Sequence, residues 1–312
     1  RCRQRVIVWP PARHYQVNPI PAETTSALKA TASFDELLTA SVTDVQRRYD
    51  DTDVMLYALG IGFGLGDRDS REMNFIYDGR GLRTMPSMAG VLVGHEFLKK
   101  CGLDTARVTT TEQKIDLYRP LPAQAELQLD SRVVSVLDHG SSDGLSVIVE
   151  SEVRMTRDST VLFTLNRTLM TGPGELRGPA GAGPAPHSLP KREPDLSCEL
   201  YSHKALPYLF RLSGDRNPRY AEDLVARSHG FPRAPLSEQC VAGLACRAIL
   251  KTICEYDSTL ISGFNLSFKG ALYPGEVLVT EMWQDRNIVS FRCTVPERAA
   301  LVVDHGKCTL AV

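Results

Sequence analysis

The chain has 312 residues and a mass of 34.4 kDa, enough for two domains of ordinary size, each with its own core. Hydrophobic residues make up 43% and charged residues 23% of the sequence, which excludes a disordered or coiled-coil chain. Thirty-six basic residues against 37 acidic ones leave a net charge of -1, so no global field would attract nucleic acid or a membrane surface. We therefore expect a small-molecule partner, recognised in a pocket.

The eight cysteines include no CxxC pair, and their spacing fits neither zinc ligation nor a dense disulfide framework. This pattern indicates a reducing compartment and predicts no metal and no cofactor. Residues 1–10 lack the apolar segment of a secretory signal, and no run approaches the roughly 18 apolar residues of a membrane span. We expect a cytoplasmic or peroxisomal location.

The first half of the chain predicts one helix followed by strands. The apolar segment 88–101 has the length of a helix, and Ser87 stands where the N-cap would be. Three runs with a period of two follow, at residues 127–137, 145–155 and 160–170, and these predict antiparallel strands joined by hairpins.

The second half of the chain repeats this order after a stretch rich in Gly, Pro and Ala at residues 172–194, which predicts an interdomain linker. Segment 239–253 predicts a helix with Ser237 as its N-cap. Strands are expected at residues 260–272, 276–283, 288–295 and 300–312.

A helix followed by antiparallel strands, occurring twice, predicts an α+β fold in which each sheet wraps around a buried helix. We interpret the repetition as an internal duplication whose two copies pair edge to edge into one long sheet. Two unrelated α+β domains are the alternative that element order alone leaves open.

One motif connects the second half to a known family. Residues 208–220, YLFRLSGDRNPRY, resemble the Y-R-L-S-G-D-x-N-P-x-H signature of the MaoC-like, (R)-specific enoyl-CoA hydratase 2 family. Supporting stretches are LYALGIG at 56–62, MPS at 85–87, DLYRPLP at 116–122 and YPGEVLVTEMW at 273–283. The resemblance covers roughly residues 45–312 and implies a double hot dog fold.

The resemblance also implies a division of the chain. Residues 1–44 would be an N-terminal extension, and residues 45–172 an N-terminal hot dog that accommodates the acyl chain and lacks the catalytic motif. Residues 173–194 would be the linker, and residues 195–312 the C-terminal hot dog with the hydratase 2 motif. The implied partner is an acyl thioester or another small carbonyl compound, and the protein could form a homodimer.

Two departures from the family pattern fall in the same site. Tyr220 stands where the family places its catalytic His, five residues after Asp215. Ser237 and Glu238 stand where the family has a His-Gly pair at the start of the hot dog helix. The implied oxyanion donor at that Gly is a backbone N–H, which Glu238 retains, although its carboxylate would disfavour a developing negative charge.

Three residues are candidate catalysts, each with a structural alternative. Asp215 is expected to be the general base, or to cap the turn that the Asn-Pro pair opens. Tyr220, whose phenol has an ordinary pKa near 10, can be an acid but not an efficient base. Glu238 would give a second carboxylate that separates the roles of acid and base, or would be an ordinary first-turn helix residue.

Three further residues are candidate substrate contacts. Asn217 is expected to orient the Asp215 turn through side-chain to backbone hydrogen bonds. Ser237 and Cys240 would line the start of the helix, although a free Cys is more commonly a small core residue.

Three functions are compatible with these residues. The first is hydration of an α,β-unsaturated acyl thioester, or dehydration of a 3-hydroxyacyl thioester, with R stereochemistry. The second is a repurposed lyase, isomerase or cyclase of polyketide-like metabolism that works without an Asp/His-activated water. The third is an acyl-binding subunit without catalysis, against which the retained Asp215 and Asn217 argue.

Overall fold

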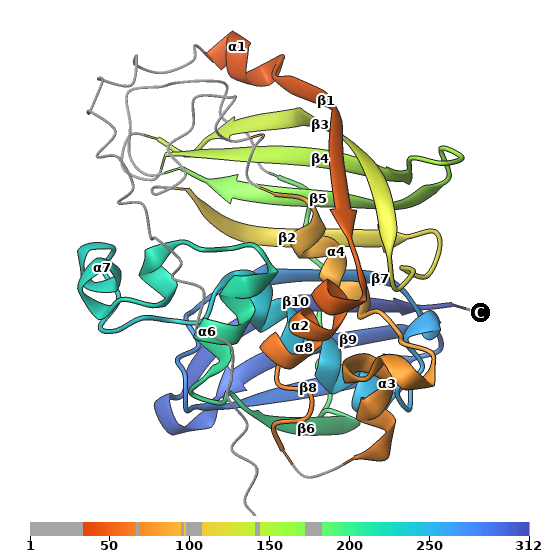
Figure 1. The fold of residues 1–312 in the computed structure, drawn as a ribbon. Helices are drawn as coiled ribbons and strands as arrows, with labels where there is room; N and C mark the ends of the chain where they lie inside the picture. The colour runs from red at the N-terminus through yellow and green to blue at the C-terminus, as the bar shows by residue number, and fades with distance from the viewer. Residues whose placement is uncertain are drawn as a thin grey trace, which may run out of the picture. The chain divides into compact units, whose positions relative to one another are not determined.

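The computed structural model describes residues 34–66, 69–94, 97, 108–140, 144–171 and 183–311. Ten strands form a single antiparallel sheet (Figure 1). They are β1 (Ser41–Tyr49), β2 (Thr109–Leu117), β3 (Ala125–Asp138), β4 (Leu145–Met155), β5 (Val161–Met170), β6 (Leu196–Tyr201), β7 (Ile261–Phe268), β8 (Val277–Asp285), β9 (Ile288–Val295) and β10 (Ala300–Leu310).

The strand order is β1-β3-β4-β5-β2-β7-β10-β9-β8-β6, which reads as the same five-strand pattern from either edge toward the middle. The two copies meet where β2 pairs with β7 in antiparallel register, with Ile115 opposite Phe264. The predicted α+β class and the edge-to-edge double hot dog are therefore confirmed.

Every strand expected from the sequence is present, and two of them, β4 and β9, have the predicted limits. The sequence did not predict β1, β2 and β6. Two of these, β1 and β6, are the edges of the sheet, where much of each strand stays exposed and polar residues replace the apolar alternation.

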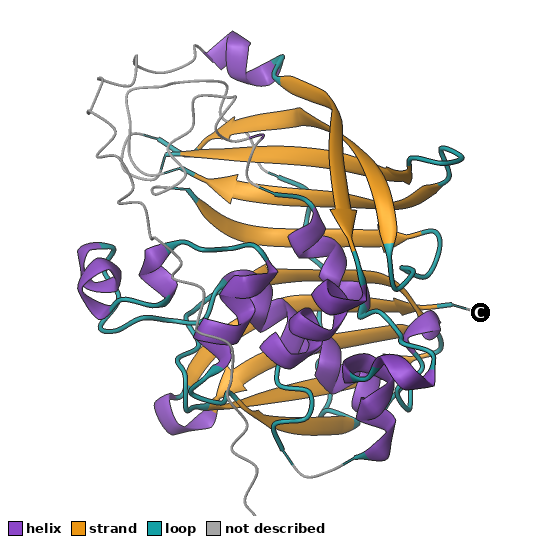
Figure 2. Cartoon of the chain, in the orientation of Figure 1, coloured by secondary structure: helices purple, strands orange, loops and turns teal. Residues whose placement is uncertain are grey.

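Helices gather on one face of the sheet (Figure 2). The α-helices are α1 (Phe34–Leu38), α2 (Asp51–Gly60), α3 (Met73–Ile76), α4 (Ala89–Leu92), α6 (Leu206–Phe210), α7 (Asp223–Ser228) and α8 (Glu238–Thr252). The 3-10 helices are η1 (Ser70–Glu72), η2 (Asp78–Arg80), η3 (Pro86–Met88), η4 (Arg211–Ser213), η5 (Pro218–Tyr220), η6 (Ser258–Leu260) and η7 (Pro296–Arg298). No helix in the described part of the chain is long and apolar enough to span a membrane.

Helix α8 is the buried helix that the sequence predicts. Its N-cap is Ser237, whose hydroxyl accepts a hydrogen bond from the Cys240 amide at 3.3 Å. Every residue from Gln239 to Leu250 is buried, so the helix is covered on all sides rather than on one stripe. Gly243 lies so close to Ile61 that an added Cβ would overlap its side chain, which shows how tightly α2 packs on α8.

The corresponding helix of the first half differs from the prediction. Helix α4 ends at Leu92, and Val93 is extended, so the predicted helix 88–101 is interrupted there. Most of its remainder lies outside the described residues. Ser87 is not an N-cap: it belongs to η3, and its hydroxyl accepts a hydrogen bond from the buried Tyr57 phenol at 2.9 Å. The tertiary contact with α2 replaces the local capping role.

A buried ion pair fastens the first half of the chain to α8. Arg247 of α8 donates to Glu72 Oε1 at 2.7 Å, and both side chains are less than 10% exposed. The Tyr256 phenol donates to the same oxygen at 3.2 Å, and the Gly64 amide donates to Glu72 Oε2 at 2.9 Å. Because both carboxylate oxygens have donors, the buried negative charge is fully compensated.

We predict that Glu72→Ala lowers the free energy of unfolding by about 3–5 kcal/mol, because it leaves the Arg247 cation buried without a partner. Glu150→Ala is the matched control, since it breaks the exposed pair with Arg132 and should cost no more than about 1 kcal/mol. Urea unfolding of both variants measures the difference, and equal losses would contradict a special role for the buried pair.

Candidate active site

The motif that carries Asp215 forms two consecutive side-chain caps. Asp215 Oδ1 accepts a hydrogen bond from the Asn217 amide at 3.1 Å, and Asn217 Oδ1 accepts one from the Arg219 amide at 3.1 Å. Asn217 is thereby the N-cap of η5, with Pro218 at the first helical position. The sequence predicted both the turn-capping alternative for Asp215 and the side-chain to backbone hydrogen bonding of Asn217. Asp215 is half-buried, and its Oδ2 oxygen has no hydrogen-bond partner among the described residues.

Tyr220 and Glu238 meet at the start of α8. The Tyr220 phenol donates to Glu238 Oε2 at 2.5 Å, and it accepts a hydrogen bond from the Arg219 guanidinium. Arg219 also lies 3.8 Å from Glu238 Oε1. Two of the predicted catalytic residues are therefore in direct contact, and Arg219, which the sequence did not single out, completes the cluster.

The electrostatics of this cluster keep the phenol protonated. Burial, and then the neighbouring Glu238 carboxylate, raise the pKa of Tyr220 well above its usual value, while Arg219 partly opposes the shift. The Asp215 carboxylate makes a smaller contribution that raises the pKa of Tyr220 in the same direction. At neutral pH the protonated Tyr220 can donate a proton or a hydrogen bond and is a poor base.

The first turn of α8 offers backbone donors. Cys240 donates its amide to the cap, whereas the amides of Glu238 and Gln239 have no hydrogen-bond partner among the described residues. Unpaired N–H groups at a helix N-terminus attract negative charge. The Glu238 amide thus remains a candidate oxyanion donor, and the buried Ser237 serves as the cap that orients this turn.

Cys240 occupies a core position. Its side chain is fully buried, and its thiol lies 3.5 Å from the Gly60 carbonyl oxygen of α2. Burial raises the pKa of the thiol far above its usual range. This environment fits the alternative that Cys240 is a small, unreactive core residue and not a substrate contact.

Sequence reasoning missed a polar cluster where the two halves meet. Gln239 of α8 donates to Gln113 Oε1 of β2 at 2.7 Å, and both side chains are buried. Gly90 of α4 lies against this pair, and its carbonyl oxygen accepts a hydrogen bond from Arg167 of β5. Gln239 Oε1 and Gln113 Nε2 have no partner within the described chain.

The sequence contains a pattern that could have identified Arg167 as a candidate site residue. Side chains of β5 point alternately to the two faces of the sheet, and Arg167 lies on the same buried face as Phe163, Leu165 and Leu169. A charged residue in the apolar phase of a strand is therefore a candidate site residue, because a buried charge needs a partner.

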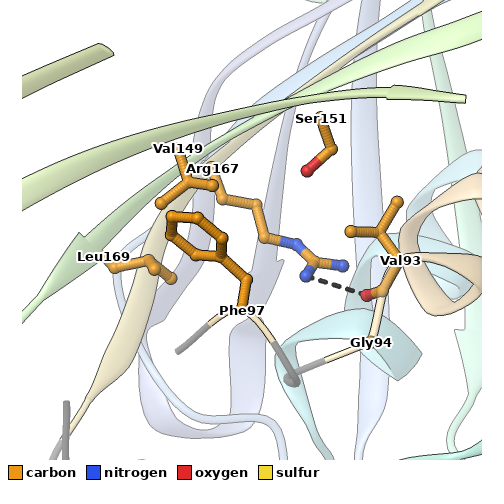
Figure 3. Close-up of a pocket in the computed structure, with 7 residues that line it drawn as sticks. All are labelled: Val93, Gly94, Phe97, Val149, Ser151, Arg167 and Leu169. Carbon is orange, nitrogen blue, oxygen red and sulfur yellow. Dashed lines mark hydrogen bonds between the residues drawn. The ribbon is translucent and has the colours of Figure 1, made fainter. Parts of the chain in front are cut away.

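Arg167 lines a small pocket in the N-terminal half (Figure 3). The other lining residues are Val93, Gly94, Phe97, Val149, Ser151 and Leu169. Figure 3 shows the guanidinium inside this ring of largely apolar side chains, hydrogen-bonded to the Val93 carbonyl oxygen. The pocket thus combines an apolar wall with one cation.

Among the residues that the structure describes, no three His, Cys, Asp or Glu side chains come together as a metal site requires. The six described cysteines are free and buried.

Comparisons with known proteins agree on one family. Residues 48–172 match the model of the MFE-2 hydratase 2 N-terminal domain. Enoyl-CoA hydratase ChsH3 of Mycobacterium tuberculosis is 29% identical over 87% of this chain and 96% of its own length. The peroxisomal enoyl-CoA hydratase 2 of Arabidopsis thaliana is 31% identical over 86% of this chain and 93% of its own. The crystal structure of a MaoC-like dehydratase from Phytophthora capsici has a TM-score of 0.77, with 25% identity over 90% of this chain and 99% of that one.

We predict that Gly90→Ala destabilises the protein by about 1–3 kcal/mol, because the new Cβ would overlap Gln239 Oε1, and the Gln239 side chain can move aside only by giving up its buried hydrogen bond to Gln113. Gly66→Ala is the matched control, because an added Cβ there meets nothing within 4 Å. Thermal unfolding measures both variants. Adding Gln239→Ala to Gly90→Ala should recover part of the loss, and an unaffected Gly90→Ala protein would show that the cluster tolerates a side chain.

Proposed function

Because this chain belongs to the MaoC-like, enoyl-CoA hydratase 2 family, we propose that it adds water to a trans-2-enoyl thioester and forms an (R)-3-hydroxyacyl thioester, or catalyses the reverse dehydration. The chain is a lyase of the hydratase/dehydratase type, as the names of its relatives indicate. The observation that carries the finer proposal is the contact of Tyr220 with Glu238 at the first turn of α8, whose amides at Glu238 and Gln239 have no partner among the described residues, with Asp215 in the turn that precedes Tyr220.

The hydration step assigns a role to each group. Asp215, through the oxygen that does not accept the Asn217 hydrogen bond, removes a proton from water, and the water oxygen adds to the β-carbon of the substrate. The electrons of the double bond move toward the thioester carbonyl, whose developing oxyanion faces the amides of Glu238 and Gln239. Protonation of the α-carbon completes the addition of one water.

Tyr220 is the proposed acid for the α-carbon. Its phenol carries a proton at neutral pH, and Arg219 beside it would compensate the phenolate that remains after the transfer. The proton held by Asp215 returns to Tyr220 through solvent after product release. The hydrogen bond between Tyr220 and Glu238 must open during this step, since the phenol hydrogen points to Glu238 in the resting structure.

A second function is favoured by the same phenol. Because the protonated phenol is a poor base, Asp215 is the one base of the proposed site, and one base with one acid suffices to move a proton from one carbon to another without adding water. The alternative is an isomerase or cyclase of polyketide-like metabolism that acts on a related carbonyl compound. In that reaction the mass of the substrate stays unchanged while its double bond moves or a ring closes.

The chain is further proposed to divide its tasks as the family does, with residues 45–172 receiving the acyl group and residues 195–312 carrying the chemistry. The peroxisomal relative supports the predicted peroxisomal or cytoplasmic location. The location and a homodimer remain predictions.

Mass spectrometry after incubation with crotonyl-CoA and longer trans-2-enoyl-CoAs tests the reaction. We expect a mass gain of one water and, by chiral chromatography, the R alcohol. An unchanged mass with a shifted double bond would support the isomerase instead, and an unchanged substrate would contradict both reactions for simple enoyl-CoAs.

We predict that Asp215→Asn lowers kcat by roughly two to four orders of magnitude, because the amide can still accept the Asn217 hydrogen bond but cannot take a proton. Asp223→Asn is the matched control, since Asp223 also accepts a backbone hydrogen bond in the second half. Steady-state kinetics and thermal unfolding separate chemistry from folding. Near-normal turnover of Asp215→Asn would reduce Asp215 to a turn residue.

We also predict that Tyr220→Phe lowers kcat about a hundredfold or more, equivalent to about 3 kcal/mol of barrier, because it removes the proton donor and keeps the ring. Tyr49→Phe is the control, a buried tyrosine that donates to the Pro122 carbonyl oxygen at 2.7 Å. If kcat of Tyr220→Phe is unchanged, the acid role passes to Glu238, and Tyr220 only fills space.

A further inference from the structure

Arg167 differs from the other two buried arginines of the described chain, Arg219 and Arg247, in having no acidic partner. All three are less than 10% exposed, but Arg247 contacts the Glu72 carboxylate and Arg219 lies 3.8 Å from Glu238, whereas no carboxylate among the described residues lies within ion-pair distance of Arg167. Arg167 instead donates to two neutral acceptors, the carbonyl oxygens of Val93 and Gly90. Its Nε–H has no partner within the described chain, as is also true of Arg219 and Arg247.

This arrangement leaves a net positive charge in an apolar environment. Burial lowers the pKa of Arg167 to about 10, and the nearby Asp215 carboxylate opposes this shift, so the guanidinium stays protonated at neutral pH. The effective cost of burying an unpaired ion is several kcal/mol. A bound anion would offset that cost, and a guanidinium with unused N–H donors is well suited to bind a carboxylate.

The position of Arg167 connects it to the candidate active site. Gly90, whose carbonyl oxygen accepts a hydrogen bond from Arg167, lies against the side chain of Gln239 in the first turn of α8, although Arg167 and Gln239 belong to opposite halves of the chain. The pocket around Arg167 has a volume of about 20 Å³, enough for a compact polar group but not for a long alkyl chain. A substrate held at Asp215 would therefore meet the Arg167 guanidinium as well as apolar side chains in the N-terminal half.

We propose that Arg167 binds a carboxylate at the end of the acyl chain remote from the thioester, so that the preferred substrates are short ω-carboxyacyl thioesters. The proposal rests on the proposed function for the orientation of the substrate. The apolar walls formed by Phe97, Val149 and Leu169 contact the methylene groups between the two ends. They also exclude water from the ion pair, which strengthens it.

A purely structural role is the alternative. Arg167 could serve only to tie α4 to β5 through the two carbonyl oxygens, with no ligand involved. The two roles differ in one measurable respect, because only the first makes affinity depend on a charge at the far end of the ligand.

Isothermal titration calorimetry with saturated acyl-CoAs tests the proposal. Each ω-carboxyacyl-CoA of four to eight carbons is compared with the neutral acyl-CoA of the same length, such as adipoyl-CoA with hexanoyl-CoA. We expect the charged member to bind at least about tenfold tighter at one or more lengths. Saturated thioesters cannot be hydrated, so failure of the proposed reaction would leave this result standing, and the reverse also holds.

Substitutions assign any preference to Arg167. Arg167→Gln, which can still donate to one carbonyl oxygen, should abolish the preference, and Arg167→Lys should retain part of it. Arg154→Gln is the control, because Arg154 lies on the neighbouring strand β4 with a partly exposed side chain and acidic partners, and should leave the preference intact. Thermal unfolding confirms that each variant is folded.

The native protein alone can overturn the proposal. Equal affinities within every pair, or no binding of any member, would show that Arg167 does not recognise a carboxylate. A preference that persists in folded Arg167→Gln would assign the recognition to another residue.

Discussion

The antiparallel pairing of β2 with β7 is the contact on which the rest of the structure depends. It joins two copies of the same five-strand pattern into one sheet, so that neither copy leaves an open edge in the middle of the molecule. It also brings Gln113 of β2 within hydrogen-bonding distance of Gln239 at the start of α8. The candidate site therefore contains residues of both halves, although only one half carries the Asp215 motif.

The two halves are joined a second time through buried polar groups, which differ in how well they are satisfied. The Glu72 carboxylate accepts hydrogen bonds from Arg247, Tyr256 and Gly64. This network stabilises the contact between the two halves of the chain. Within the described chain the Nε groups of Arg167 and Arg247 are both unpaired, but Arg167 has no carboxylate partner, and the Gln113–Gln239 pair retains two unpaired atoms. Buried polar groups that are left partly unsatisfied in a folded protein commonly mark a place where a ligand or water supplies the missing partner.

If Tyr220 takes the place of the family histidine, as the motif predicts, the acid–base character of the proposed site changes rather than disappears. An imidazole near neutrality can exchange protons in both directions, whereas the buried phenol beside Glu238 holds its proton firmly. Arg219 supplies a positive charge that the sequence motif did not reveal, and it contacts both Tyr220 and Glu238. The site is thus rebuilt around a phenol, a carboxylate and a guanidinium.

The sequence by itself determined the elements whose signals are local. Period-two runs gave β4 and β9 their limits, and a capping serine before a long apolar segment located α8, because strand alternation and helix capping depend on neighbours in the chain. The motif around Asp215 and Asn217 identified the family and the turn that those two side chains cap.

Only the tertiary structure decided what depends on contacts between distant segments. It ended α4 at Leu92, used Ser87 as a partner of Tyr57 instead of as a helix cap, and placed the thiol of Cys240 in the core. It likewise placed Gly90, which accepts a hydrogen bond from Arg167, against Gln239 of α8, although Arg167 and Gln239 belong to different halves of the chain. Such contacts are set by how whole elements pack, and local sequence propensity carries no information about which distant side chain will become the neighbour.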